Sequence, residues 1–426
     1  MRYITMTINR KFIFLPLFLT FAGFAAARQE LSLSWDEARK LALEHNPSVK
    51  AAASAAEQAG YNYQAALNSY MPQIGLSHSF SRSGGDASSP ASRWGASIST
   101  SENLLDLRTV SSVKSDRIAW EKAEADYLAV SASVRQTLAA AFADLLFAQK
   151  RLEVQKKILS IREENAKLIR LKYESGMESK GNALYTEALA ENARVSLKKA
   201  GRQLQAAQRS LLEAIGMEGA DAVSGRGDIS VPAFFMDEAR ISLALEKAPR
   251  MVSAKKTLES ARELTNSARY AALPTIRASQ SFGWSGAGEF PRDKSWSLGL
   301  SLSVPVFSGG PTYYFNNLAA SKKALAAAEE NFRAAKISLA AALRSGYDSY
   351  LSAAETAGAN TALLKANEER YKEAQIKYMA GKISFIDLEN VEQNFVDSDL
   401  NQLDYARSAH NSKIALESLL GVGVEE

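Results

Sequence analysis

The sequence predicts a mainly α fold with a smaller β part, arranged in two similar halves. Long stretches without Pro or Gly carry apolar residues at seven-residue spacing, and shorter paired segments alternate apolar with small polar residues. A repeat then relates one half of the chain to the other. Because the chain contains no Cys, it must fold without disulfides and has no thiolate metal site.

The first residues have the three parts of a secretory signal peptide. Arg10 and Lys11 end a basic region, the apolar run Phe12–Ala25 follows, and residues 25–27 form an Ala-x-Ala cleavage site. The apolar run is too short to cross a bilayer as a helix. We therefore expect residues 1–27 to be removed on export. The mature chain is then nearly neutral, so no nucleic acid is expected as a partner.

The repeat is visible in short identical stretches. Residues 36–39 (Asp-Glu-Ala-Arg) recur as residues 237–240, and residues 41–44 (Leu-Ala-Leu-Glu) recur as residues 243–246. Each copy is much longer than a solenoid repeat, so we infer the duplication of a half-protein. The predicted parts are a first repeat at 28–216, a linker at 217–232 with a short strand near 229–231, and a second repeat at 233–426.

Each repeat should contain the same elements. We expect two helices, a β-hairpin, a long helix and a return helix, in that order. In the first repeat the last three are predicted at about 73–103, 104–173 and 182–216, and in the second at about 275–304, 311–378 and 384–420. Pro72, Pro274 and Pro305 mark the helix–strand junctions.

The hairpin segments have the alternation of transmembrane β-strands. Ile74, Leu76, His78 and Phe80 fall on one face, while Gly and Ser occupy the other. Segments of about ten residues suit tilted membrane strands, with the apolar face toward lipid and the small polar face toward a wet lumen. Candidates for an aromatic girdle are Trp94, Trp284, Trp296 and Phe282. On this evidence alone, a half-buried sheet in a soluble domain stays an alternative.

The long helices favour a cylindrical wall. Between residues 104 and 173 two apolar heptad series lie on nearly opposite sides of one predicted helix. The series are Leu138, Leu145, Leu152, Leu159, Ala166 and Tyr173, and Phe147, Val154, Ile161 and Leu168. A stave in a wall needs two such seams, whereas a two-stranded coiled coil needs one. In the second half the second seam is weaker, and Gly346 and Gly358 interrupt it, so we expect that helix to be less straight.

The predicted strands require more than one chain. Four strands cannot close a barrel, and lipid does not tolerate an open sheet edge. Three copies would supply twelve strands, and cyclic symmetry is the ordinary arrangement for identical chains. We therefore predict a homotrimer, with a transmembrane β-barrel and a coaxial helical barrel.

These features together resemble the TolC-like outer-membrane efflux protein family over essentially the whole mature length. The resemblance is carried by the two-fold repeat, the Pro-bounded hairpins, the exit motif at residues 305–310 (Pro-Val-Phe-Ser-Gly-Gly) and the Tyr-x-x-Gly tips at 173–176 and 378–381. It implies an outer-membrane channel whose helical part lies in the periplasm. It also implies three kinds of partner: a periplasmic membrane-fusion adaptor protein, an inner-membrane efflux pump or ABC transporter, and outer-membrane lipid.

The resemblance also suggests residues of a periplasmic gate. In the family, two acidic residues one turn apart often surround the closed entrance after the second tip. Asp387 matches the first of them, whereas Asn390 stands at the second. The gate candidates are Asp387, Asn390, Glu389, Lys382, Asn182 and Glu178. Tyr173, Gly176, Tyr378 and Gly381 are candidates for adaptor docking, with plain helix termination as the alternative.

No catalytic constellation or cofactor motif emerges. His45, His78 and His410 lie on different predicted elements, and no zinc-protease motif, nucleophile elbow or phosphate loop occurs. We therefore predict a protein that is not an enzyme and needs no metal or cofactor. The alternatives are a periplasmic coiled-coil adaptor or structural protein, a secreted hydrolase with a helical stalk, and a passive porin.

Overall fold

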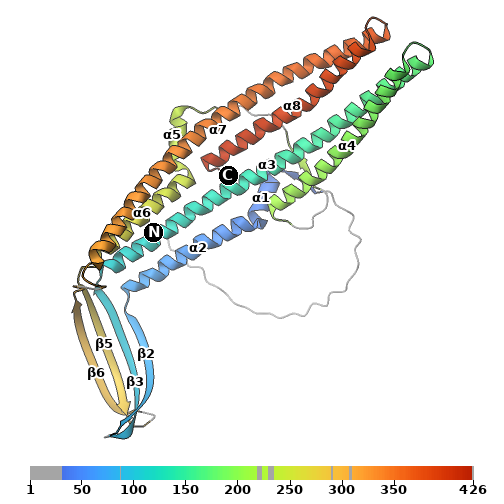
Figure 1. Ribbon diagram of the computed structural model, residues 1–426. Coiled ribbons are helices and arrows are strands. Elements are labelled where there is room, and N and C mark those ends of the chain that lie inside the picture. The colour runs from blue at the N-terminus through green and yellow to red at the C-terminus, as the bar shows by residue number, and fades with distance from the viewer. Residues whose placement is uncertain are drawn as a thin grey trace, which may run out of the picture.

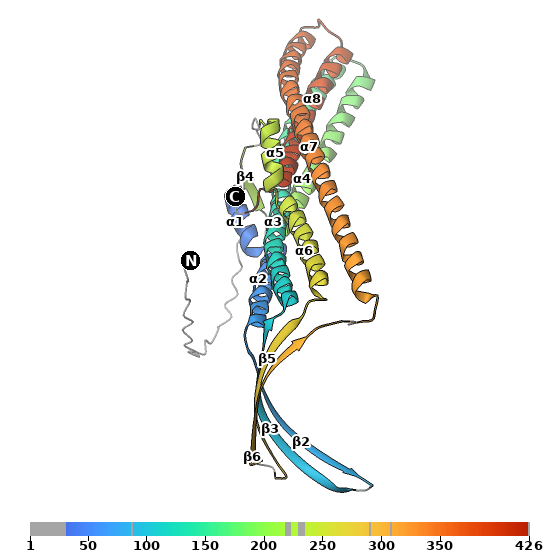
Figure 2. The same ribbon diagram turned by 90° about the vertical axis from the view of Figure 1, so that its left-hand side faces the viewer.

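The computed structural model describes residues 31–86, 88–217, 223–228, 235–288, 291–306 and 309–424. The molecule is elongated, with strands at one end and two helical hairpins at the other (Figure 1). The side view shows the helices extending upward from the upper end of the sheet (Figure 2). The predicted signal peptide, the short strand at 229–231 and residues 307–308 of the exit motif lie outside the described residues.

The order of elements is the same on both sides of the middle of the chain. The first half contains β1 (Leu31–Ser34), α1 (Trp35–His45), α2 (Pro47–Leu67), a short 3₁₀ turn (Asn68–Tyr70), β2 (Gln73–Gly85), β3 (Ser88–Leu105), α3 (Leu107–Glu174) and α4 (Lys180–Ile215). After β4 (Val223–Arg226) come α5 (Glu238–Lys247), α6 (Pro249–Tyr270), β5 (Thr275–Gly286), β6 (Asp293–Ser303), α7 (Tyr313–Met379) and α8 (Phe385–Leu420). Among the described residues, none of the helices is long and apolar enough to cross a membrane.

Helix α3 begins three residues later than the sequence predicts, because Asp106 caps it. The Asp106 carboxylate accepts hydrogen bonds from the backbone N–H of Arg108 at 3.0 Å and that of Thr109 at 3.4 Å. Before this cap, strand β3 continues through Leu105, which pairs with Ile276 after a local irregularity. The apolar residues just before the cap therefore belong to the sheet.

The second long helix, predicted at about 311–378, contains both glycines that interrupt its second heptad seam. Helix α7 runs continuously through Gly346 and Gly358. A Cβ atom at Gly346 would lie 3.3 Å from Leu419 Cδ1 and 3.5 Å from Leu416 Cδ1, so this glycine gives α8 room to pack closely. Tertiary packing here outweighs the low helix propensity of glycine.

Two pairs of helices meet end to end. Helix α4 ends at Gly216, in a left-handed conformation, against the start of α2, where the Asn46 side chain donates to the Ala214 carbonyl at 2.9 Å. Helix α8 ends at Gly421, also left-handed, against the start of α6. A Cβ at Gly421 would lie 2.2 Å from Pro249 Cδ, so only glycine fits this junction.

The main sheet is antiparallel, in the order β2-β3-β5-β6. One face carries exposed apolar side chains, with Leu76 83% and Trp296 74% exposed, whereas the other carries Ser and Gly. Trp94 lies across from Phe80, and Phe282 across from Trp296, with Trp284 beside them on the same face. The outer edges of β2 and β6 have no strand partner within the described part of the chain.

A small parallel sheet that the sequence did not predict lies at mid-height. Strands β1 and β4 pair in register from Leu31 with Val223. The pair packs on α3, where the Gly225 N–H donates to Gln149 Oε1 at 3.2 Å. Helix α1 covers the same face of α3, with its Trp35 ring edge-on to Phe142. These elements hold the first half of the chain around the middle of α3.

Candidate functional site at the helical tips

Both hairpin tips close with the same backbone geometry. Gly176 and Gly381 adopt left-handed conformations with φ of 75° and 68°. In each tip the N–H of the residue after the glycine donates to a carbonyl five residues earlier, at 2.8 Å. This is the Schellman arrangement, which satisfies carbonyl groups left free at a helix end. The glycines predicted from the Tyr-x-x-Gly pattern are therefore required by the turn itself.

The two tip tyrosines have different surroundings. Tyr378 is 3% exposed, and its hydroxyl donates to Glu178 Oε1 on the other hairpin at 2.7 Å. Lys172 lies over the Tyr378 ring, with Nζ 3.8 Å from the centroid, and donates to the Tyr378 carbonyl at 3.3 Å. By contrast, Tyr173 is 40% exposed. Tyr378 is thus one of the residues through which the second hairpin contacts the first near the tip.

Glu178 is held in its charged form. Its carboxylate also accepts from Asn182 Nδ2 at 2.9 Å and from the Ser179 N–H at 3.3 Å. Partial burial raises the pKa of Glu178, but the hydrogen bonds from Tyr378, Asn182 and Ser179, with the charge of Lys172, outweigh it and lower the pKa. Burial and this carboxylate together raise the pKa of Tyr378, which stays protonated as the donor. Glu178 and Asn182, both predicted from sequence, therefore lie in one cluster.

Asp387 has a structural role that the sequence analysis did not assign. It forms a capping box with Ser384, accepting from the Ser384 N–H at 3.1 Å and hydroxyl at 2.7 Å. The hydrogen bonds from the Ser384 side chain and backbone lower the pKa of this exposed carboxyl. Asn390 and Lys382 are exposed, and no side-chain hydrogen bond of theirs occurs within the described residues.

Glu389 belongs to a second contact between the hairpins. It accepts a hydrogen bond from the Tyr185 hydroxyl of α4 at 2.6 Å, about one turn from the start of α8. This bond, and then desolvation and the carboxylate charge, raise the pKa of Tyr185. The predicted gate residues thus fall into separate groups: Glu178 with Asn182, Glu389 with Tyr185, and the cap of Asp387.

A buried polar cluster between the tips and mid-height was missed by sequence reasoning. Arg162 of α3 pairs with Glu392 of α8 at 2.9 Å, with side chains only 8% and 4% exposed. Asn165 donates to the same carboxylate and, at 3.3 Å, to the Tyr371 hydroxyl of α7. Burial raises the pKa of Glu392, although the Arg162 charge and the Asn165 hydrogen bond oppose the shift. The signal for this cluster was an Arg and a Glu on helix faces otherwise filled by apolar residues.

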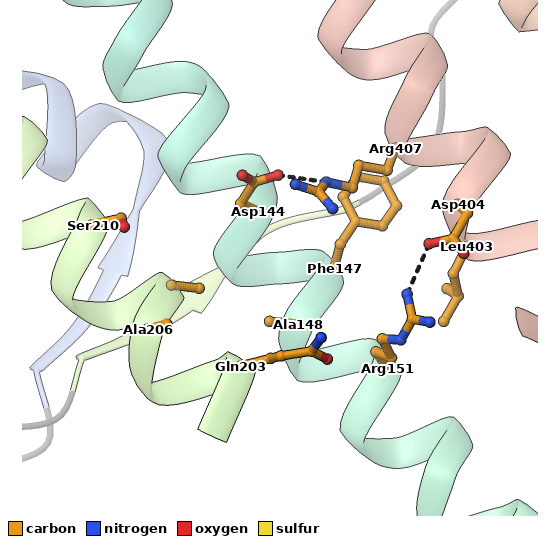
Figure 3. A pocket seen from close by; sticks show the side chains of 11 residues that line it. Asp144, Phe147, Ala148, Arg151, Gln203, Ala206, Ser210, Leu403, Asp404 and Arg407 are labelled. Atoms are coloured by element: carbon orange, nitrogen blue, oxygen red, sulfur yellow. Dashed lines mark hydrogen bonds and ion pairs between the residues drawn. The ribbon is translucent and has the colours of Figure 1, made fainter. Parts of the chain in front are cut away.

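The same seam continues away from the tips as a series of ion pairs between α3 and α8. Lys157 pairs with Asp399 at 3.0 Å. Farther along, Arg151 pairs with Asp404 at 2.8 Å and Arg407 with Asp144 at 2.7 Å (Figure 3). These last two pairs line a cleft of about 290 Å³ between α3, α4 and α8. The hairpins are therefore joined from mid-height to the tip.

The comparisons with known proteins define the class of this chain. Residues 38–217 and 240–422 match the outer membrane efflux protein family. The match spans most of the sequence, so the chain belongs to that family. It is an outer-membrane protein of a channel family, and the predicted resemblance is confirmed.

Individual relatives agree with this assignment. The chain is 27% identical to the outer membrane protein OprJ of Pseudomonas aeruginosa over 433 residues, covering 94% of this chain and 86% of OprJ. Its fold is similar to the open state of the Neisseria gonorrhoeae MtrE outer membrane channel, with a TM-score of 0.79, 20% identity, and coverage of 91% and 89%. It is also similar to the Campylobacter jejuni CmeC outer membrane channel, with a TM-score of 0.78, 18% identity, and coverage of 92% and 86%.

Proposed function

We propose that three copies of this chain assemble into a closed tunnel that exports solutes through the outer membrane. The observation that carries the proposal is the sheet: one face is apolar and exposed, the other is small and polar, and both outer edges are free among the described strands. Free edges cannot face lipid. Pairing β6 of one copy with β2 of the next, three times, removes every edge and yields twelve strands.

The long helices support the same assembly. The weaker heptad series of α7 is exposed along its length in the single chain; its members are Ser345, Ser352, Ala359, Ala366 and Glu373. Small side chains allow the backbone of a neighbouring helix to approach closely. In the proposed trimer this face of α7 meets the outer face of α4 from the next copy. The helices then form a cylinder that extends into the periplasm.

We place the gate at the tips. The Tyr378–Glu178 bond joins the second hairpin to the first, so opening that moves the second hairpin outward must break it. The buried Arg162–Glu392 pair is costly to separate. The ion pairs nearer mid-height oppose sliding of α8 along α3. We therefore expect the tip of the second hairpin to move, while the contact between α3 and α8 nearer mid-height stays intact. Three Asp387 carboxylates near the entrance would favour cations.

The proposed partners follow from family membership. A periplasmic adaptor would contact the tips, where Tyr173 is exposed. An inner-membrane efflux pump or ABC transporter would then deliver substrate into the tunnel. In this scheme that pump sets the cargo class, whether drug, metal ion, peptide or protein, because the Ser and Gly that make up most of the small polar face of the sheet are generic.

Two measurements test the proposal. Outer-membrane extracts should contain a detergent-stable trimer that inserts into planar bilayers with a small, mostly closed current. A soluble periplasmic monomer would instead favour an adaptor or structural protein, and a large, steadily open current would favour a passive porin. Photo-crosslinking from a residue near Tyr378 in cells should capture an adaptor. Capture of no periplasmic protein by an active exporter would contradict the docking role.

A further inference from the structure

We propose that Arg277 forms an anion-binding site where the barrel joins the helical tunnel. The proposal rests on the tunnel described above, in which the small polar face of the sheet lines the lumen. Residues alternate along β5, so Arg277 lies on the face of Ser279 and Ser281, opposite that of Ile276 and Ala278. Arg277 is near the helical end of the strand and is exposed.

The position of the guanidinium is fixed by its neighbours. In the sheet register Arg277 lies between Asn103 of β3 and Ser301 of β6. Its Nε donates to Asn103 Oδ1 at 2.9 Å, and the Ser301 hydroxyl donates to its carbonyl at 3.3 Å. No carboxylate of the described residues lies within ion-pair distance of Arg277. The remaining N–H groups form a planar fork that matches carboxylate and phosphate oxygens.

A polar cleft adjoins this guanidinium. It has a volume of about 380 Å³, and its walls include Ser101, Gln73 and Thr109. Arg277 is the one charged side chain among its described lining residues. The carboxylate that caps the neighbouring helix, Asp106, accepts from backbone N–H groups and from the Thr109 hydroxyl at 3.0 Å, and it is not one of the described residues that line the cleft. The Gln73 amide and the Thr109 hydroxyl donate within the protein, so the cleft offers an anion chiefly the positive charge and the remaining N–H groups of Arg277.

On the small polar face, Arg277 is the one charged residue of the described strands at this level of the sheet. Of the described strand residues, the other charged ones on the small polar face are Arg93 and Asp293, at the far end near the hairpin turns, and they are opposite in sign. Three Arg277 residues in the trimer would thus place a positive ring at the base of the barrel. The ligand class is a carboxylate, phosphate or sulfonate group on a solute passing through.

Bilayer recordings test this site directly. The parent carries Tyr378→Phe, so that the channel is expected to open more often. In a KCl gradient, Arg277→Gln should raise the K⁺/Cl⁻ permeability ratio by about fivefold. Three charges about 10 Å from the axis, screened over a Debye length of about 10 Å, change the permeation of each ion about twofold, in opposite directions. Inorganic pyrophosphate should reduce the parent current and leave that of Arg277→Gln unchanged. Arg277→Lys should keep the parent's K⁺/Cl⁻ ratio.

The matched control is Arg82→Gln. Arg82 has the same charge but lies on the other face of β2, near the hairpin turn, so the permeability ratio should not change. A normal conductance with an unchanged ratio in Arg277→Gln, or an equal shift in Arg82→Gln, would overturn the site while leaving the tunnel intact. No current from the parent or the unmodified protein would overturn both the tunnel and this site.

Discussion

Replacing Tyr378 by Phe removes one hydroxyl from the contact between the hairpin tips. The ring keeps its buried position beneath Lys172, so packing is preserved and only the 2.7 Å bond to Glu178 is lost. A hydrogen bond to a charged acceptor contributes roughly 1.5–3 kcal/mol, and the partial exposure of Glu178 favours the lower end. We take about 1.5 kcal/mol for each copy.

This free energy translates into a change in channel opening. About 1.4 kcal/mol corresponds to a tenfold change in an equilibrium constant. If release of one tip admits ions, the open probability should rise about tenfold, and if all three must separate, the increase is larger. Single-channel recording of purified trimers in planar bilayers measures this probability without an adaptor or pump.

The chain supplies a matched control at the other tip. Tyr173 is 40% exposed, and its hydroxyl has no hydrogen bond within the part of the chain that the structure describes. Tyr173→Phe should therefore leave the current unchanged. An unaltered open probability in an intact Tyr378→Phe trimer would refute the idea that this bond holds the tips together.

The other expectations concern the same seam and the helix junctions. Asp387→Gln keeps a side chain that can complete the capping box but removes the charge, so it should reduce cation preference with little loss of stability. Asp387→Ala should reduce both the cation preference and the stability of the trimer. Reversal potentials measure the first property, and heat dissociation of the trimer measures the second. Gly421→Ala should destabilise the trimer by about 3 kcal/mol, because its Cβ meets Pro249 and its backbone is left-handed. Gly358→Ala should instead stabilise it by about 0.5–1 kcal/mol, and urea unfolding measures both. Arg162→Met should cost about 3 kcal/mol in the same assay, since Glu392 loses its buried partner. Because the pKa of Glu178 is lowered, the stability that its carboxylate gives to the closed tips is fully present above the ordinary Glu pKa of 4.5. This stability is lost as the pH falls through the lower pKa of the folded protein, so the current should rise only in that acidic range. A rise near pH 7 would contradict this assignment.

Local patterns were sufficient to predict most of the fold. The alternation after Pro72 predicted a strand that the structure places at Gln73–Gly85, and the absence of Pro and Gly predicted a helix that runs over Leu107–Glu174. Where a side chain competes with these patterns the predicted boundary was wrong, because the cap of Asp106 delays the start of α3. The second long helix was predicted at about 311–378 and runs over Tyr313–Met379, with Gly346 packed against α8. Burial and capping are decided by three-dimensional neighbours.

The candidate site could be predicted only in part. Tip glycines follow from backbone geometry, and the sequence located them. The contact of Tyr378 with Glu178 joins residues 200 positions apart, so no local spacing indicates it. Sequence also treated the two tip tyrosines as equivalent, whereas one is buried in the contact between hairpins and the other is exposed.

The central claim is that β2 and β6 of neighbouring copies pair to close a barrel. The chain has no Cys, so any disulfide that forms between engineered cysteines cannot involve a native thiol of this chain. Ser77→Cys on β2 can be combined in turn with Cys at Ser295, Ser297 or Ser301 on β6, all on the small polar face. These strands are opposite edges of one sheet, so a bond between them joins different copies. We predict that oxidised outer membranes contain a covalent species of three chains and none larger. Absence of crosslinking at every pair, or a ladder extending beyond three chains, would contradict the closed trimer.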